Sequence, residues 1–142
     1  MIALRPATLS DAAFLLALRN DPAVRALSRT SHLIDATEHQ RWFATRLADP
    51  ATRLYVAEHD GGAVGQGRLD RIRMDTYELS LTVVPHMRGR GFGTAIIGAL
   101  LAKLAVHETA VAIVKMKNAA SLRAFFANGF DGDRTVTLVR NA

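Results

Sequence analysis

Cysteine is absent from the sequence, and its absence removes three kinds of chemistry. Such a chain has no disulfide framework, no zinc site with thiolate ligands and no thiol nucleophile. No run approaches the roughly 18 uninterrupted apolar residues of a membrane-spanning helix, and the first residues contain no apolar signal-peptide core. We therefore expect a cytoplasmic protein without a membrane partner.

Several catalytic motifs are missing as well. The Gly-Lys-Ser/Thr of a Walker A loop does not occur, and no serine lies in a Gly-x-Ser-x-Gly elbow. The five histidines show no metal-ligand spacing, so we expect no metal. These absences argue against P-loop nucleotide hydrolysis, serine hydrolysis and metal chemistry.

What remains is the composition of a globular protein. The chain has 142 residues, of which 49% are apolar and 22% charged, without repeats or linkers, and we expect one domain spanning 1–142. Its net charge of +5 favours an anionic partner, whether nucleic acid, acidic membrane or phosphorylated small molecule. Charge alone does not choose among these.

The first half of the chain predicts a strand, two helices and a hairpin. Residues 2–6 read as a strand, and Ser10 is the expected N-cap of a helix over 11–20 whose inner face carries Phe14, Leu15 and Leu18. A second helix opens at 35–38, with Thr37 and Gln40 as a capping box and Phe43 and Leu47 on one side. Strands over 53–59 and 63–72 pair through a turn at 60–62.

The second half predicts a parallel crossover. Strand 77–84 alternates apolar and polar residues, helix 93–107 carries an apolar stripe, and the β-branched run 110–114 is expected to be a strand covered on both faces. Asn118 caps a helix that ends at Gly129, and 133–140 closes the sheet. The expected fold is a mixed α/β, largely antiparallel sheet with one βαβ crossover, in the order β-α-α-β-β-β-α-β-α-β.

The segment between strand 77–84 and the following helix predicts an anion site. Three alternating glycines at 89, 91 and 93 leave main-chain N–H groups accessible, the helix start adds free N–H groups, and Arg88 and Arg90 supply charge. A dinucleotide fingerprint requires different glycine spacing and an acidic residue about 20 positions later, whereas the next strand ends at Lys115. Residues 90–93 also match the start of an RNA-binding motif, but helical periodicity follows, so we expect no nucleic acid.

Arg88–Gly93 fits the pattern R-x-x-G-x-G and resembles the acetyl-CoA signature of the GNAT superfamily of N-acetyltransferases. Two further segments resemble the same family: the Asn-led helix ending in Gly-Phe at 118–130, and the opening at 4–12. The resemblance covers nearly the whole chain. It implies the GNAT fold, acetyl-CoA as co-substrate, and transfer of an acetyl group to a small primary amine, with a homodimer left open.

The resemblance also implies residue roles. Those for acetyl-CoA binding are Val83, Val84, Arg88, Gly89, Arg90, Gly91, Phe92, Gly93, Thr94, Asn118, Ser121 and Phe125. Asn118 is equally readable as a helix N-cap, and Phe125 stands where the family often has a tyrosine acid. Glu78 is the candidate base, with a solvated or arginine-paired glutamate as the alternative. A non-catalytic acyl-CoA-binding domain is the other class of protein that these residues allow.

The acceptor side is expected in the first two helices and their loop. That segment resembles acetyltransferases of nucleotide-linked amino sugars, and also the ribosomal-protein Nα-acetyltransferase branch. The candidate acceptor residues are Arg25, His32, Trp42 and Ser80, and Arg29 and Arg41 are further candidates for a pyrophosphate. Trp42 is equally readable as helix core.

Overall fold

A single six-stranded sheet organises the computed structural model of the chain, which describes residues 1–27, 32–115, 117–131 and 137–140. Its strands follow one another in sequence order: β1 (Ala3–Pro6), β2 (Thr52–His59), β3 (Gly62–Arg73), β4 (Thr76–Val83), β5 (Thr109–Ile113) and β6 (Thr137–Arg140). Neighbouring strands are antiparallel except for β4 and β5, which are parallel. The expected mixed sheet with one parallel crossover is confirmed.

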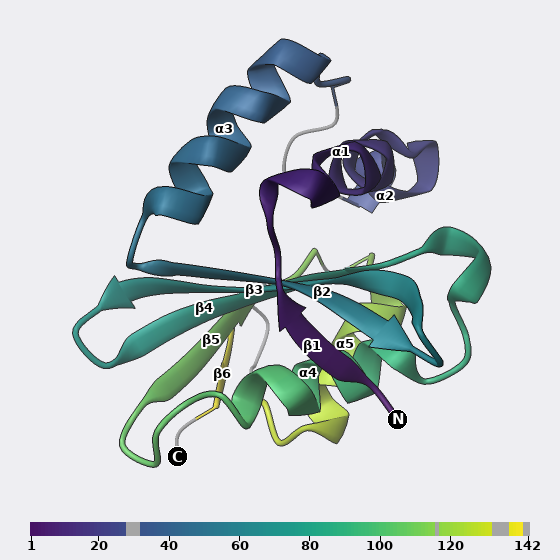
Figure 1. Cartoon of the computed structure of the whole chain (residues 1–142). Coiled ribbons are helices and arrows are strands. Elements are labelled where there is room, and N and C mark those ends of the chain that lie inside the picture. Colours follow the sequence, from purple (N-terminus) through teal and green to yellow (C-terminus); the bar gives the residue numbers. More distant parts are fainter. Residues whose placement is uncertain (28–31, 116, 132–136, 141–142) are drawn as a thin grey trace.

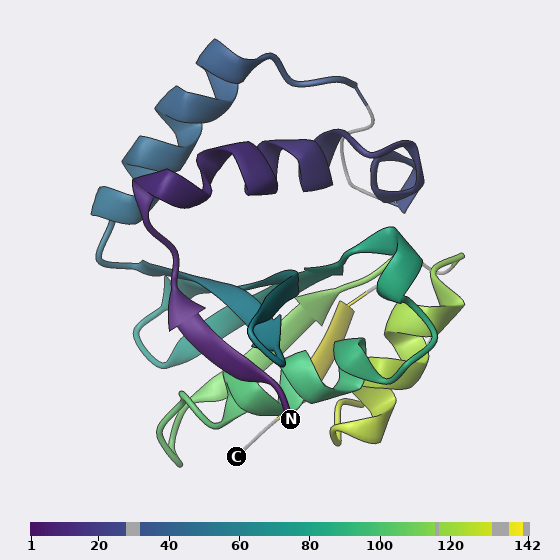
Figure 2. The same ribbon diagram turned by 45° about the vertical axis from the view of Figure 1, so that its right-hand side comes forward.

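Helices cover the two faces of this sheet unequally (Figure 1). On one face lie α1 (Ala12–Asn20), α2 (Pro22–Leu27) and α3 (Ala36–Ala48), and on the other lie α4 (Phe92–Leu101) and α5 (Ala119–Ala127). Two short 3-10 turns, Leu9–Asp11 and Pro85–Met87, precede α1 and α4. Figure 2 shows α1–α3 standing over the sheet as a separate layer.

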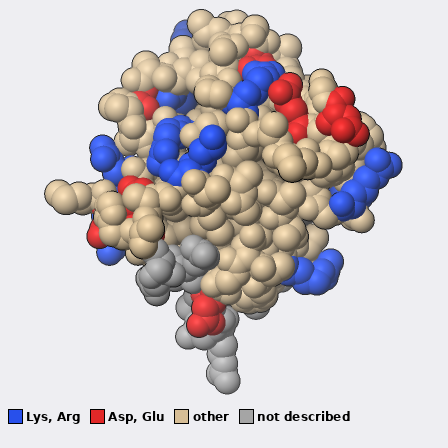
Figure 3. All heavy atoms as spheres, turned by 60° about the horizontal axis from the view of Figure 1, so that its bottom comes forward, with Lys and Arg blue, Asp and Glu red and all other residues tan. Residues whose placement is uncertain are grey.

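The larger core lies between the sheet and α4. Ile96, Ile97 and Leu100 of this helix are fully buried against strand residues. The close approach requires glycine in β3: a Cβ at Gly67 would lie 3.1 Å from both Leu100 methyl carbons, and one at Gly65 would collide with the Thr82 carbonyl. No charged residue occurs in α4, and the middle of the corresponding surface has no charged side chains (Figure 3).

A smaller core joins the other helical layer to β2. Phe43 of α3 and Val56 of β2 are both fully buried there, together with Leu15 of α1. This layer therefore packs mainly over β2, and it leaves the same face of β4 and β5 less covered. Ile113 in β5 is 42% exposed, so the prediction that 110–114 is covered on both faces is wrong.

The helix starts differ from the predicted caps. Asp11 and Thr8 form the N-terminal capping box, in place of Ser10, and Asp35 caps α3 by accepting from the Glu38 N–H at 2.8 Å, in place of Thr37. In the first case the Asp11 carboxylate accepts from the Thr8 N–H at 2.8 Å, and in the second the Asp35 carboxylate is the cap itself; negative charge at either helix start complements the helix dipole.

Two helices also differ from the predicted element order. The helix α2 was not predicted, although Pro22 at its first position suits a helix start. The helix α4 ends at Leu101 and not at His107, because the hydrogen bonds tighten there: Lys103 and Leu104 donate to the carbonyls three residues earlier. The closing strand is described only over 137–140, so the rest of its predicted range lies outside the described residues.

Candidate active site

The glycine loop adopts the backbone that its sequence predicts. Gly89 and Gly91 have φ of 79° and 83°, and a Cβ at either position would meet nothing within 4 Å. Glycine is therefore required by conformation and not by crowding. Gly91 is the N-cap of α4, and its carbonyl accepts from Ala95 at 3.1 Å, so the N–H groups of Phe92, Gly93 and Thr94 have no partner within the helix.

These free N–H groups lie at a cavity of about 400 Å³. Arg88 from the loop and Arg123 from α5 are its cationic residues, so the site combines a helix start with two guanidinium groups. The other lining residues include Gly89, Gly91, Phe92, Gly93, Thr94, Met87 and Val83. Arg90 is not among them: it is exposed, with one guanidinium nitrogen 3.8 Å from the Met87 sulfur.

The edge of β4 next to this cavity presents free main-chain groups. Val84 donates to the Val64 carbonyl of β3 at 2.8 Å, so its N–H is already used. Because main-chain groups alternate sides along a strand, those of Val83 and Leu81 point away from β3, toward β5. Within the described residues, β5 pairs with β4 only at Thr76–Glu78, so the edge at Leu81 and Val83 is open.

The start of α5 faces the same place. The Asn118 side-chain oxygen accepts from the Ser121 N–H at 3.2 Å, which makes Asn118 an N-cap, and both residues line the cavity. The cap uses only the oxygen, so the amide NH₂ of Asn118 is available to a ligand. The two readings of Asn118 are compatible.

A second, larger cavity of about 850 Å³ lies between the sheet and the α1–α3 layer. It has Val24, Leu81, Thr82, Asn118 and Ser121 in common with the first cavity. The anion cradle and the second cavity, which we call the acceptor cleft, therefore meet beside the open edge of β4. A ligand extended along that edge has its far end in the acceptor cleft.

The candidate base and two of the candidate acceptor residues line the acceptor cleft. Glu78 and Ser80 lie on its β4 floor, and Trp42 projects from α3. Phe125 also lines it, but its side chain is 2% exposed and packs edge-on against Phe130 with ring centroids 4.9 Å apart. A phenyl ring has no proton to donate, and the tyrosines Tyr55 and Tyr77 are buried in the core on the α4 side.

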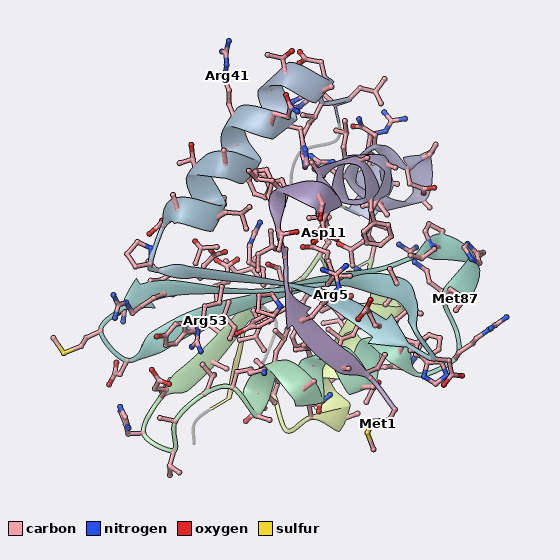
Figure 4. All side chains as sticks on the ribbon, in the orientation of Figure 1. Met1, Arg5, Asp11, Arg41, Arg53 and Met87 are labelled. Atoms are coloured by element: carbon pink, nitrogen blue, oxygen red, sulfur yellow. The ribbon has the colours of Figure 1, made fainter. Side chains whose placement is uncertain are left out.

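The other predicted acceptor residues lie elsewhere. Arg25 donates to the Asn20 carbonyl at 3.2 Å, and His32 is exposed, 4.0 Å from the Glu38 carboxylate; neither lines the acceptor cleft. Arg41 points away from the sheet (Figure 4). Arg29 lies outside the described residues.

The acceptor cleft instead contains cationic residues that the sequence analysis did not single out. They come from two helices, α1 and α3, from strand β3 and from the segment after β5: Arg19, Arg46, Arg68, Arg71 and Lys115. Asp70 and Glu78 are the acidic residues of the lining, so positive charge is in excess.

Asp70 organises part of this cluster. Its carboxylate lies 2.7 Å from Arg68 and 3.3 Å from Arg46, and it accepts from Thr52 at 2.9 Å. Both guanidinium groups also lie 5.7 Å from the ring centroid of Trp42. The indole is thus held in place at the side of the acceptor cleft, although it is 38% exposed.

His39 is a further residue that the sequence analysis did not single out. It is 3% exposed, lines the acceptor cleft, and burial lowers its pKa from the ordinary value. Helical spacing was the available signal, since His39, Phe43 and Leu47 recur every four residues on one face.

Searches for two other kinds of site give negative results within the described ranges. No cluster of three or more histidine, aspartate or glutamate side chains there is arranged to hold a metal ion. None of the helices in the same ranges has the length and apolar character needed to cross a membrane.

Together, the glycine cradle, the open strand edge and the adjoining cleft define a class of protein that holds a long phosphorylated ligand beside a second substrate. The family model described as "Acetyltransferase (GNAT) domain" matches residues 2–131. The chain belongs to this family of acetyltransferases.

Solved structures with this fold are numerous, and their sequences are distant. A spermidine N-acetyltransferase from Vibrio cholerae in complex with CoA and spermine is 19% identical, with a TM-score of 0.80 over 97% of this chain and 91% of that one. A ribosomal-protein-alanine N-acetyltransferase from Brucella melitensis is 23% identical, with a TM-score of 0.81 over 99% of each chain. The aminoglycoside acetyltransferase AAC(6')-Ib in complex with CoA is 16% identical, with a TM-score of 0.82 over 99% of this chain and 95% of that one. No curated protein sequence matches the chain significantly.

Proposed function

We propose that this protein transfers the acetyl group of acetyl-CoA to a primary amine by direct attack in a ternary complex, in the cytoplasm, and that the amine belongs to an amino-sugar nucleotide. One observation carries the proposal: the anion cradle and the acceptor cleft meet at the open edge of β4. A donor bound in the cradle and an amine bound in the cleft come together there without a covalent enzyme intermediate. The lack of cysteine agrees with direct transfer.

The chain's own groups fit acetyl-CoA in three places. The N–H groups of Phe92–Thr94, with Arg88 and Arg123, suit its pyrophosphate. The main-chain edge at Leu81 and Val83 suits the amides of the pantetheine arm, which pair as an added strand does. We propose that a main-chain N–H of β4 near Val83 donates to the thioester oxygen as negative charge develops there.

The amine must lose a proton before it attacks. Glu78 lines the acceptor cleft on the same face of β4 as Ser80 and Thr82, and we propose that it accepts this proton, directly or through a water molecule. Phe125 occupies the position of the family's usual acid, so the departing thiolate takes its proton from water. A thiolate is a stable enough leaving group for this.

The charge of the acceptor cleft supports a nucleotide-linked acceptor. Five cationic residues against two acidic ones favour a substrate that carries phosphate. Polyamines and aminoglycosides are cationic and are disfavoured by the same excess. Thiol release measured with UDP-linked amino sugars, peptide N-termini and spermidine tests this. Turnover on peptides alone contradicts the acceptor assignment, and CoA binding without turnover on any amine contradicts the enzymatic assignment.

The role of Glu78 is tested by Glu78→Gln, which keeps shape and removes the basic carboxylate. We expect kcat to fall by about 10²-fold or more, with little change in the KM for acetyl-CoA. Thr76→Val, two residues before Glu78 in the same strand and outside both cavities, serves as the control. An unchanged kcat in Glu78→Gln assigns the proton transfer to another group.

A further inference from the structure

His39 is a largely buried residue in the lining of the acceptor cleft. Its main-chain N–H is used within α3, donating to the Asp35 carbonyl at 3.0 Å, whereas neither ring nitrogen has a hydrogen bond to any described residue. The ring packs between Trp42 and Phe43, with both centroids 5.8 Å away. Neither ring nitrogen is among the fully buried, unpartnered atoms of the described residues, so the ring nitrogens are accessible to a molecule in the acceptor cleft.

A buried polar group without a partner lies on the sheet side of the acceptor cleft. The Ser80 hydroxyl oxygen is buried and has no hydrogen-bond partner among the described residues. Ser80 belongs to the sheet floor and His39 to the helical layer above it, and both line the acceptor cleft. The unsatisfied Ser80 hydroxyl and the His39 ring come from separate elements and line one cavity, so a molecule bound there can form hydrogen bonds with both.

The chemistry of the two groups selects the partner. A neutral imidazole has one N–H to donate and one nitrogen that accepts, and a hydroxyl has one O–H to donate and an oxygen that accepts. A sugar hydroxyl has the same dual capacity, whereas an ammonium group only donates and a phosphate only accepts. Burial lowers the pKa of His39 and so favours its neutral form at pH 7.

We propose that His39 and Ser80 bind hydroxyl groups of the acceptor, which makes them specificity-determining residues for a polyhydroxylated sugar ring lying against Trp42. The proposal rests on the proposed function, since it divides the acceptor into two parts. The cationic residues hold the phosphate end, and His39 with Ser80 holds the sugar. A phosphate-bearing amine without hydroxyl groups satisfies only the first part.

The binding test compares UDP-glucosamine with UDP in the CoA-saturated protein. The ring resonances of ¹⁵N-histidine-labelled protein are followed, and His39 is assigned by its loss in His39→Phe. We expect the His39 signal to shift saturably with UDP-glucosamine and to stay in place with UDP. A signal that shifts equally with both ligands, or with neither, overturns the proposal.

Variants provide the matching affinities by calorimetry. His39→Phe keeps the ring volume and Ser80→Ala removes only the hydroxyl; each is expected to weaken UDP-glucosamine binding about tenfold while leaving the affinity for UDP unchanged. His39→Gln, which retains a donor and an acceptor, is expected to bind UDP-glucosamine more tightly than His39→Phe does. If His39 acted only by packing, glutamine would not recover affinity. His107→Phe is the control, because His107 is exposed and lies outside both cavities.

The two proposals fail differently. If UDP itself does not bind, the nucleotide-linked acceptor of the proposed function is wrong. If UDP binds but the sugar neither adds affinity nor moves the His39 signal, the proposed function stands and only the roles of His39 and Ser80 are wrong. Should His39→Phe not fold, Ser80→Ala gives the same decision, since it leaves the helical layer untouched.

Discussion

The turn between β1 and α1 depends on a single carboxylate. Asp11 is buried and accepts two hydrogen bonds from Arg5, at 2.8 and 2.9 Å, and a third from the Thr8 N–H at 2.8 Å (Figure 4). The Arg5 guanidinium and the Thr8 N–H lower the pKa of Asp11 to about 2. The carboxylate therefore stabilises the folded protein as long as it is ionised.

This pair predicts a loss of stability in acid. The folded pKa of Asp11 lies below the unfolded one, so the unfolded chain binds more protons, and its contribution disappears as pH falls from about 4 to about 2. Asp11→Asn is expected to lower the free energy of unfolding at pH 7 by about 1–2 kcal/mol and to flatten the acid limb. Urea unfolding across this pH range measures it, with the exposed Asp75→Asn as control. Equal acid limbs for Asp11→Asn and the wild type contradict the assignment.

The glycines of the cradle predict a separation of binding from stability. Gly89 and Gly61 have nearly the same φ, 79° and 78°, and both have open space around them. Alanine at either position is expected to cost about 1 kcal/mol of unfolding free energy, because both enter the left-handed region. Only Gly89→Ala is expected to raise the KM for acetyl-CoA, which steady-state kinetics measures. A similar rise in Gly61→Ala removes the argument for the cradle.

At the scale of elements, the distance between α4 and β3 sets the geometry of the cradle. Gly65 and Gly67 let Ile96 and Leu100 lie directly on the sheet, which fixes where the first turn of α4 points. The same contact separates the two faces of the sheet, with the anion cradle at the start of α4 and the acceptor cleft between the sheet and the α1–α3 layer.

Gly65→Ala is expected to destabilise the protein by about 1–3 kcal/mol, because the new Cβ collides with the Thr82 carbonyl and crowds Ile96. The matched control is Gly62→Ala in the same strand, where the nearest atom is the His59 carbonyl oxygen at 3.7 Å. Thermal unfolding compares the two. Indistinguishable melting temperatures show that the backbone around Gly65 moves to accommodate the methyl group, and that the close packing of β3 on α4 does not fix the position of the helix.

Local patterns predicted most elements, and long-range contacts explain the failures. Alternation in β4 and the apolar stripe of α4 were sufficient, since each follows from burial of one face. The exposure of Ile113 was not predictable locally, because it depends on how far the α1–α3 layer extends over the sheet. The acceptor residues Arg68 and Asp70 were missed because a charged strand residue has the same local pattern whether it faces solvent or a cleft.

At the scale of the whole molecule, excess positive charge coincides with the two binding regions. The chain carries a net +5, and both cavities have more cationic than acidic residues in their linings. Long-range attraction of anionic substrates is the expected result, and salt screens such attraction over about 10 Å at 0.1 M.

Salt is therefore expected to act on substrate capture more than on folding. Between about 0.05 and 0.5 M KCl we expect kcat/KM for acetyl-CoA to fall several-fold, while the urea midpoint changes little. Acetyl-dephospho-CoA, which lacks one phosphate, is expected to show a shallower dependence. If kcat/KM depends equally on salt for the two donors, the phosphate that acetyl-dephospho-CoA lacks does not interact electrostatically with the protein.

The open edge of β4 has a consequence for how such proteins diverge. A donor that binds main-chain groups hardly constrains the side chains at positions 81 and 83, because every residue except proline supplies the same N–H and C=O. Substitutions at these positions do not change donor binding as long as the backbone of β4 keeps its conformation. Chains with this fold can therefore keep the same main-chain edge for binding a donor although their sequences are only 16–23% identical to this one.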